Sequence, residues 1–275
     1  MNNEIAIILP VYKKDNVDYL NKSVESILYQ TYQHIHLYIG VDGPVDEDLK
    51  ESLEAFERNT FINVVWFPEN RGLACVLNDL LDICFKEGYE YIARMDADDI
   101  SLPDRLEKQI SFMEQHQEID VVGGAIDEID ENGDKRGKVV AYPEGPEDCK
   151  AFFSKRNPHA HPAVLFRKSF FDKLKGNKYR PEYRQNQDTM LWFDGMMMGT
   201  QHANIPDVVL KFRMTDTMFK KRRNGWAFAK KQFKDRLTIN KELGYGWKAD
   251  VYGFAMFCLL ISPVWIKKIA YRFLR

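Results

Sequence analysis

The sequence predicts an α/β protein in which a mostly parallel β-sheet is flanked by helices. Residues 5–9 form an uninterrupted apolar run that Pro10 closes, which is typical of a strand buried on both faces. Three more short apolar runs follow, and amphipathic helical patterns separate them. This alternating order favours a parallel sheet with helices on both faces.

The expected elements follow one another closely through the first hundred residues. We expect a helix over residues 18–30, a strand over 35–41, a helix around 49–56, a strand over 64–67, a helix from 73 that Gly88 terminates, and a strand from 91. Ser101 and Pro103 then predict the start of a helix on which Arg105 lies on a solvated face. A hairpin turn is expected over 130–134 and a late strand over 208–212.

Composition limits the class of protein. The 275 residues, 45% of them apolar, suffice for one large domain or two small ones. The four cysteines lack Cys-x-x-Cys spacing, so they indicate neither a zinc site nor a disulfide framework. No glycine precedes Gly40, although a dinucleotide-binding turn would need several after the first strand. The first residues do not form a secretory leader, and we expect a cytoplasmic protein.

Charge is distributed unevenly along the chain, although the net charge is only −2. Residues 211–275 contain 16 Lys and Arg against 4 Asp and Glu, so residues 1–210 hold 23 basic and 37 acidic side chains. The basic end indicates an anionic partner surface, either lipid headgroups or nucleic acid.

Polar side chains follow the ends of the predicted parallel strands, where sheets of this kind bind ligands. They are Tyr12 after the first strand, Asp42 after the second, residues 70–72 after the third, and Asp96, Asp98 and Asp99 after the fourth. Carboxylate oxygens are preferred ligands of hard divalent cations that carry phosphates. The sequence therefore predicts a Mg²⁺ or Mn²⁺ site at this edge of the sheet.

In this order the motifs resemble the family 2 glycosyltransferases, whose GT-A fold is a Rossmann-like α/β sheet. The matching segments are residues 8–12, 41–43, 70–74 with Asn78, 95–99, 102–109, His161-Pro162 and 187–192. Because the matches end near residue 215, we expect a catalytic domain over residues 1–215 and a basic helical extension over residues 216–275.

The resemblance implies a UDP-sugar donor. Pro10, Tyr12, Asp42 and Arg71 would border the nucleotide base, Asp96 would approach the ribose, and Asp98 would hold the Mn²⁺ or Mg²⁺ ion, with Asp99 beside it. The chain reads Asp-Gly-Pro at residues 42–44, where many relatives read Asp-Asp-Gly, so a second acid of the family pattern is missing.

The resemblance also implies transfer with inversion, in which Asp188 accepts the proton of the acceptor hydroxyl. Gln187 would help to position Asp188, and His161 would line the floor of the site. Arg213, or one of the basic residues 220–223, would lie over the donor phosphates. From the residues alone Asp188 is also a candidate helix N-cap, and His159 is expected to be a simple loop residue.

The last part of the chain combines apolar and basic segments. From Trp226 a helix with Ala229 and Phe233 on one side is basic and amphipathic, and residues 251–266 are apolar before further lysines. This pattern favours a helix lying on an anionic membrane. Nucleic acid is a poorer fit, because no base-stacking motif accompanies the charge. A buried helix or a dimer contact is the alternative.

Together these features predict a hexosyltransferase that acts at the inner face of the plasma membrane. It would move a Glc-, Gal- or GlcNAc-type sugar from a UDP-sugar to a lipid-linked glycan acceptor, in O-antigen, capsule or exopolysaccharide biosynthesis. Two alternatives stay open. A sugar-nucleotide pyrophosphorylase would need a Gly-rich phosphate loop after the first strand, and a non-catalytic peripheral membrane adaptor would tolerate the loss of Asp98 and Asp188.

Overall fold

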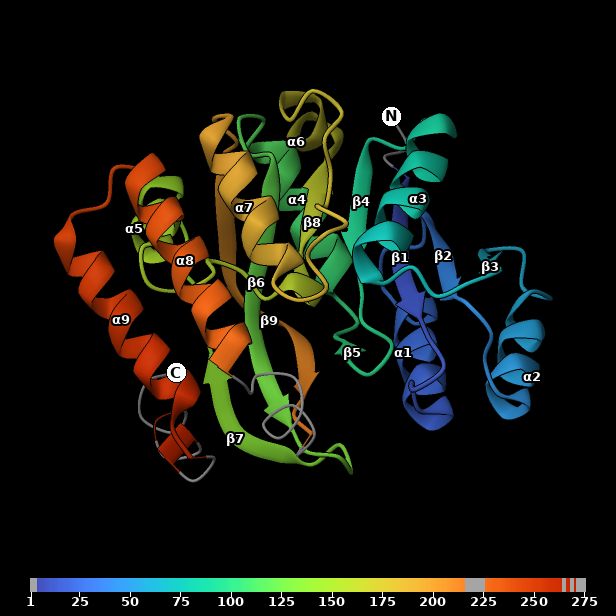
Figure 1. The fold of residues 1–275 in the computed structure, drawn as a ribbon. Coiled ribbons are helices and arrows are strands. Elements are labelled where there is room, and N and C mark those ends of the chain that lie inside the picture. The colour runs from blue at the N-terminus through green and yellow to red at the C-terminus, as the bar shows by residue number, and fades with distance from the viewer. Residues whose placement is uncertain (1–3, 216–225, 264–265, 268–269, 271–275) are drawn as a thin grey trace.

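The computed structural model describes residues 4–215, 226–263, 266–267 and 270 (Figure 1). Within them one mixed sheet contains β1 (Ile5–Val11), β2 (Ile35–Asp42), β3 (Ile62–Phe67), β4 (Tyr91–Arg94), β5 (Ile100–Ser101), β6 (Val121–Ile129), β7 (Lys135–Val140), β8 (Leu165–Arg167) and β9 (His202–Arg213). The strand order is β3-β2-β1-β4-β8-β6-β9-β5, with β7 paired to β6.

Helices cover both faces of this sheet, as predicted. The helices in the described part of the chain are α1 (Val17–Leu28), α2 (Glu47–Phe56), α3 (Leu73–Lys86), α4 (Arg105–Gln115), α5 (Pro146–Phe153), α6 (Lys168–Lys173), α7 (Gln187–Met197), α8 (Trp226–Glu242) and α9 (Trp247–Ile261). Alternate residues of β1 serve the two faces: Ile5 and Ile7 pack in a core with α1, α2 and α4, whereas Ala6 and Ile8 pack with α3, α6 and α7. Residues 5–9 are therefore fully buried.

The N-terminal half of the sheet is parallel, because β3, β2, β1 and β4 all run in the same direction. Their carboxyl ends consequently meet at one edge. Beyond β4 the sheet becomes mixed: β8 runs antiparallel to both β4 and β6, and β9 is parallel to β6. The short strand β5 returns to pair antiparallel with the end of β9, which brings the chain after β4 against the far half of the sheet.

The structure corrects two expectations about the segment after β4. Residues 100–101 form β5, so the helix begins at Arg105 and Pro103 precedes it. The Arg105 side chain is fully buried instead of solvated, and its Nη2 donates to the Arg94 carbonyl at 2.9 Å. Burial lowers the pKa of this guanidinium to about 9, and the charge of Arg94 acts in the same direction.

The C-terminal helices α8 and α9 form an antiparallel hairpin at one side of the molecule (Figure 1). Ring contacts join Trp226 to Phe257 and Phe233 to Phe254, at centroid separations of 5.3 and 6.0 Å. The hairpin is anchored to α5, since Arg236 Nη1 donates to the carbonyl of its last residue at 2.5 Å. No helix in the described part of the chain is both long and apolar enough to cross a membrane.

Candidate active site

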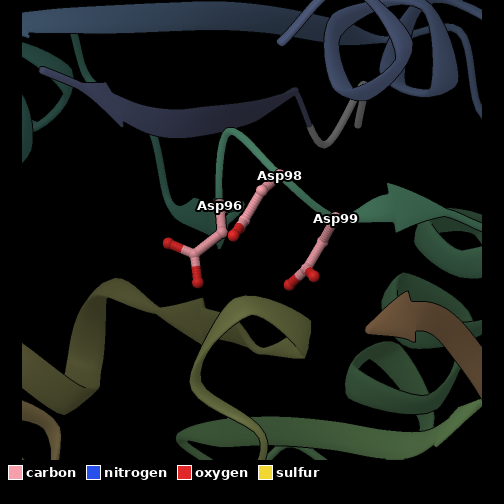
Figure 2. Close-up of side chains that lie close together, drawn as sticks. All are labelled: Asp96, Asp98 and Asp99. Carbon is pink, nitrogen blue, oxygen red and sulfur yellow. The ribbon is translucent and has the colours of Figure 1, made fainter. Parts of the chain in front are cut away.

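The loop that joins β4 to β5 carries three carboxylates that point to the same side (Figure 2). Ligand oxygens of Asp96, Asp98 and Asp99 all lie within 4.8 Å of one another. The loop is held from both directions: Arg94, at the end of β4, forms an ion pair with Asp96, and the Ser23 hydroxyl on α1 donates to the Asp96 carbonyl at 2.8 Å. The three predicted acids are thus brought together at the carboxyl edge of the sheet.

Asp99 is the most buried of the three, with 1% of its surface exposed. Burial raises the pKa of its carboxyl well above the ordinary value, and the charges of Asp98 and Asp96 raise it further. Its Oδ1 accepts a backbone hydrogen bond from Arg213 at 2.8 Å, whereas its Oδ2 has no hydrogen-bond partner among the described residues. Clustered carboxylates with an unsatisfied oxygen fit a hard divalent cation, which would offset their mutual repulsion.

Arg213 fastens this acidic loop to the rest of the fold. Its Nε donates to the Asp98 carbonyl at 2.8 Å and its Nη1 to the Asp130 carbonyl in the hairpin turn at 3.0 Å. The guanidinium also lies 4.1 Å from the centre of the Tyr19 ring. The structure therefore gives Arg213 a bracing position beside the acids, and the other basic candidates, residues 220–223, lie outside the described residues.

Asp42, which is predicted to border the donor, is buried at the end of β2. Its two carboxylate oxygens accept the backbone N–H groups of Arg71 and Gly72, at 2.8 and 2.9 Å. Asp42 thus shapes the loop that precedes α3. Arg71 is half-exposed beside it, 5.1 Å from the centre of the Phe67 ring, and forms an ion pair with Asp79 on α3.

Pro10 and Tyr12 lie at the end of β1, next in the sheet to Asp42. Pro10 pairs in register with Gly40 of β2. The Tyr12 backbone N–H donates to the Asp15 carboxylate at 2.9 Å, which fixes the turn into α1. Both residues are partly exposed. The residues predicted to border the donor therefore come from neighbouring strand ends.

On the other side of the site, Asp188 lies in the first turn of α7. The N-cap of this helix is Asn186, so the interpretation of Asp188 as the cap is wrong. Asn157 orients the carboxylate instead, because its Nδ2 donates to Asp188 Oδ2 at 2.9 Å. The neighbouring Gln187 is buried, and its Oε1 has no hydrogen-bond partner among the described residues.

Tyr179 and His161 form a buried pair near Arg94 and α7. A hydrogen bond of 2.7 Å joins His161 Nε2 to the Tyr179 hydroxyl, and both side chains are buried. Burial lowers the pKa of His161 well below its ordinary value, and the Arg94 charge contributes. Burial raises the pKa of Tyr179, opposed by Arg94 and reinforced by Asp188 and Asp96. Carboxylates from both sides of the site therefore act on one hydroxyl.

His159 is not the simple loop residue that the sequence suggests. It is 3% exposed, and its Nδ1 and Nε2 hydrogen-bond to Asn204 and His202 at 2.8 and 3.0 Å. Both ring nitrogens have protein partners, which makes it part of the core. Sequence reasoning also missed Asn157, Tyr179 and Arg94, although Asn157 and Arg94 lie within four positions of the predicted residues His161 and Asp96.

Comparisons with known proteins identify the chain's relatives. The sequence model described as Glycosyl transferase family 2 matches residues 6–174. The amylovoran biosynthesis glycosyltransferase AmsE of Erwinia amylovora is 35% identical over 227 residues, covering 82% of this chain and 82% of that protein. The UDP-Gal:alpha-D-GlcNAc-diphosphoundecaprenol beta-1,3-galactosyltransferase of Escherichia coli is 26% identical over 231 residues, covering 84% of this chain and 81% of that protein.

Solved structures of S. aureus TarS share the fold. The complex of TarS 1-349 with UDP-GlcNAc matches with a TM-score of 0.65 and 15% identity, covering 87% of this chain and 66% of that one. A longer TarS structure matches with a TM-score of 0.62 and 14% identity, and this chain spans 43% of it. At identities this low the matches are evidence for the fold alone. They confirm the predicted sheet flanked by helices, with a helical C-terminal part.

Proposed function

Because this chain belongs to glycosyl transferase family 2, we propose that it transfers a hexose, with inversion, from a UDP-sugar to a lipid-linked glycan in the assembly of a bacterial surface polysaccharide. The observation that carries this proposal is the pairing of two acidic groups across one site. The carboxylates of the β4–β5 loop lie within 4.8 Å of one another, and Asp188 stands at the head of α7 with its own amide partner.

The donor would bind along the ends of β1, β2 and β4. Pro10, Tyr12, Asp42 and Arg71 would border the base, and Asp96 would approach the ribose. Asp98, with Asp99 beside it, would hold Mn²⁺ or Mg²⁺, and the donor set of clustered carboxylate oxygens fits either ion. When bound, such a cation supplies positive charge for the diphosphate of the leaving group.

Asp188 would act as the general base of the transfer step. As the acceptor oxygen bonds to the anomeric carbon, its proton passes to the Asp188 carboxylate. The bond from the anomeric carbon to the phosphate oxygen breaks, and UDP leaves with that electron pair. Attack opposite the leaving group inverts the anomeric configuration. Asn157 would keep the carboxylate aimed at the acceptor, while Gln187 and His161 would line the site beneath it.

The acceptor class rests on the relatives' names. The E. coli relative is named for UDP-Gal and for an acceptor that ends in diphosphoundecaprenol, and the E. amylovora relative for amylovoran biosynthesis. The lipid part of the acceptor in the E. coli name agrees with the basic C-terminal part of this chain, which suits an anionic membrane. We therefore propose a glycan on a lipid carrier as the acceptor. We accordingly propose that the enzyme works at the inner face of the plasma membrane.

A calorimetric titration of UDP, with GDP as the control nucleotide, tests the donor site without knowledge of the acceptor. We expect UDP to bind more tightly in the presence of Mn²⁺, and Asp98→Asn to remove this metal dependence. Asp188→Asn should bind UDP as the parent does, because it retains the donor site. In a separate assay of sugar transfer it should be inactive, because it lacks the base. Asp172→Asn, at an exposed ion pair on α6, is the matched control and should behave as the parent.

Three other results would contradict parts of this proposal. Metal-dependent binding that survives Asp98→Asn would place the cation elsewhere. Transfer that persists in Asp188→Asn would require another base. If neither nucleotide binds under any metal condition, the transferase proposal fails, and the adaptor hypothesis takes its place.

A further inference from the structure

The outer side of α9 carries a continuous apolar stripe. Its members are Trp247, Val251, Phe254, Cys258 and Ile261. Their spacing of three and four residues puts them on one face of the helix. Trp247 is 71% exposed, Val251 57% and Phe254 55%, so three bulky apolar side chains in a row face outward. The Phe233 ring of α8 borders the stripe at Phe254, and the exposed remainder is an apolar patch of the kind that marks interaction sites.

Another side of α9 packs against the rest of the protein. Asp250 accepts a hydrogen bond from Asn240 of α8 at 2.8 Å, and the Phe257 ring lies 5.5 Å from that of Phe233. The side of α9 next to these contacts is buried at Ala249 and Gly253. The hairpin therefore has an inner side against the domain and α8, and an outer side that bears the stripe.

A row of lysines on α8 borders the stripe. Lys230, Lys234 and Lys241 are exposed, and they occupy one helical face beside Phe233, the residue that contacts α9. Viewed along each helix from its first residue, the lysine row lies clockwise of Phe233 on α8, and the stripe lies clockwise of Phe257 on α9. Because α8 and α9 run antiparallel, both faces therefore lie on the same side of the hairpin. Neither the stripe nor the row contains an acidic residue.

We propose that this outer face docks on an anionic lipid bilayer, with the stripe in the headgroup region and the lysine row against the lipid phosphates. An exposed apolar face beside clustered lysines is the pattern of a helix that lies in a membrane interface. Trp247 lies at the start of the stripe, and tryptophan is favoured at such interfaces. A second copy of the chain fits less well, because a twofold contact would bury both lysine rows without acidic partners.

The surface is independent of the proposed reaction, because vesicle binding requires neither donor nor acceptor. The test is flotation of the full chain with vesicles of phosphatidylcholine alone or with phosphatidylglycerol added. We expect the parent to bind the anionic vesicles at least about tenfold more tightly than the neutral ones. Fluorescence of Trp247 should shift to shorter wavelength on binding, and Trp247→Phe should diminish that shift.

Two variants remove one component of the face at a time. Trp247→Glu with Val251→Glu removes the stripe, and Lys230→Glu with Lys234→Glu reverses the row. Each should weaken binding to anionic vesicles by at least about tenfold. The matched controls are Val139→Glu on β7, a valine with the same 57% exposure, and Lys22→Glu with Lys86→Glu on α1 and α3. All variants should keep the thermal unfolding midpoint of the parent, since every altered side chain is exposed.

Three results would overturn the proposal. The first is vesicle binding that neither pair of substitutions weakens. The second is a parent that stays off every vesicle and forms a dimer that the stripe variant dissociates, which would assign the face to a second copy. The third is a monomeric parent that binds no vesicle at all. Titration of UDP into the same variants keeps these results separate from the donor site.

Discussion

Asn157 holds the Asp188 carboxylate in one orientation. The hydroxyl of Thr189 donates to Asn157 Oδ1 at 3.0 Å, which leaves Nδ2 to donate to Asp188. The amide is therefore fixed at both ends, and the carboxylate receives a directed hydrogen bond. A base that must meet an acceptor hydroxyl within hydrogen-bond reach depends on such positioning.

We expect Asn157→Ala to lower kcat by about tenfold, because the Asp188 carboxylate loses its orienting donor. The dissociation constant of UDP should not change, since Asn157 contacts Asp188 and Thr189 and is not among the residues that we propose to border the donor. Steady-state kinetics together with UDP titration check both parts. Asn59→Ala, in the exposed turn after α2, is the control and should leave kcat unaltered. An equal loss of UDP affinity in Asn157→Ala would instead indicate general disruption of the site.

The sequence predicted that the acids after β4 lie together better than it predicted their surroundings. Asp96, Asp98 and Asp99 are adjacent in the chain, so a strand end suffices to bring them together. The partners of Asp188 and Asp99 are remote in sequence: Asn157 is 31 positions away and Arg213 is 114. Arg105 shows the same limit. Its charge predicts a solvated face, whereas its buried guanidinium donates to the carbonyl of Arg94, which is 11 positions away.

At the scale of elements, the loop before α3 depends on an unusual glycine. Gly72 has φ +94° and ψ 160°, a conformation that residues with a side chain rarely adopt. A Cβ there would lie 2.5 Å from Nη1 of Arg184. The backbone N–H of Gly72 donates to the Asp42 carboxylate. Gly88, at the other end of the helix, has φ +90° but open space around it.

These two glycines provide a matched comparison. Gly88→Ala should lower the free energy of unfolding by about 1–2 kcal/mol, from backbone strain alone. Gly72→Ala should cost about 2–3 kcal/mol, because displacement of Arg184 adds to the strain. Only Gly72→Ala should also weaken UDP binding, by roughly tenfold, since it disturbs the Asp42 contact. Urea denaturation and UDP titration measure these effects, and equal UDP affinity in both variants would contradict this role of the loop.

Elements with a clear period were predicted well. The helices α1, α2 and α3 and the strands β1 to β4 have continuous apolar runs or helical stripes, and each was expected near its observed place. The three-residue strand β8 and the short helix α6 were not expected, because so few residues contain no period to detect. The antiparallel position of β8 between β4 and β6 depends on contacts that no local pattern records.

At the scale of the whole molecule, three buried histidines make the free energy of unfolding depend on pH. Burial lowers the pKa of His159 from 6.5 to about 4, and it lowers those of His161 and His202 well below 6.5. Above pH 6.5 folded and unfolded chains are both neutral at these positions, and their contribution to stability is complete. As the pH falls toward 4, the unfolded chain binds protons that the folded chain does not, so stability decreases.

We therefore expect the free energy of unfolding to fall as the pH drops below 6.5. His159 contributes a limiting slope of about 1.4 kcal/mol per pH unit until the pH approaches its folded pKa of about 4, and His161 and His202 act in the same direction. Urea denaturation over this range measures the slope. His159→Gln should reduce it by one proton, whereas His34→Gln, at an exposed position, should leave it unchanged. A slope equal in the parent and in His159→Gln would contradict the assignment.

The hydrogen bond between the Arg213 backbone and Asp99 also has a consequence for the order of folding during translation. It spans 114 positions, and β5 pairs with the same strand that carries Arg213. As the chain leaves the ribosome, β1 to β4 can associate early, because their contacts are comparatively local. The acidic loop can gain its hydrogen bond to Arg213 only after β9 has emerged. We therefore expect a nascent chain to form the parallel half of its sheet before it completes the acidic loop.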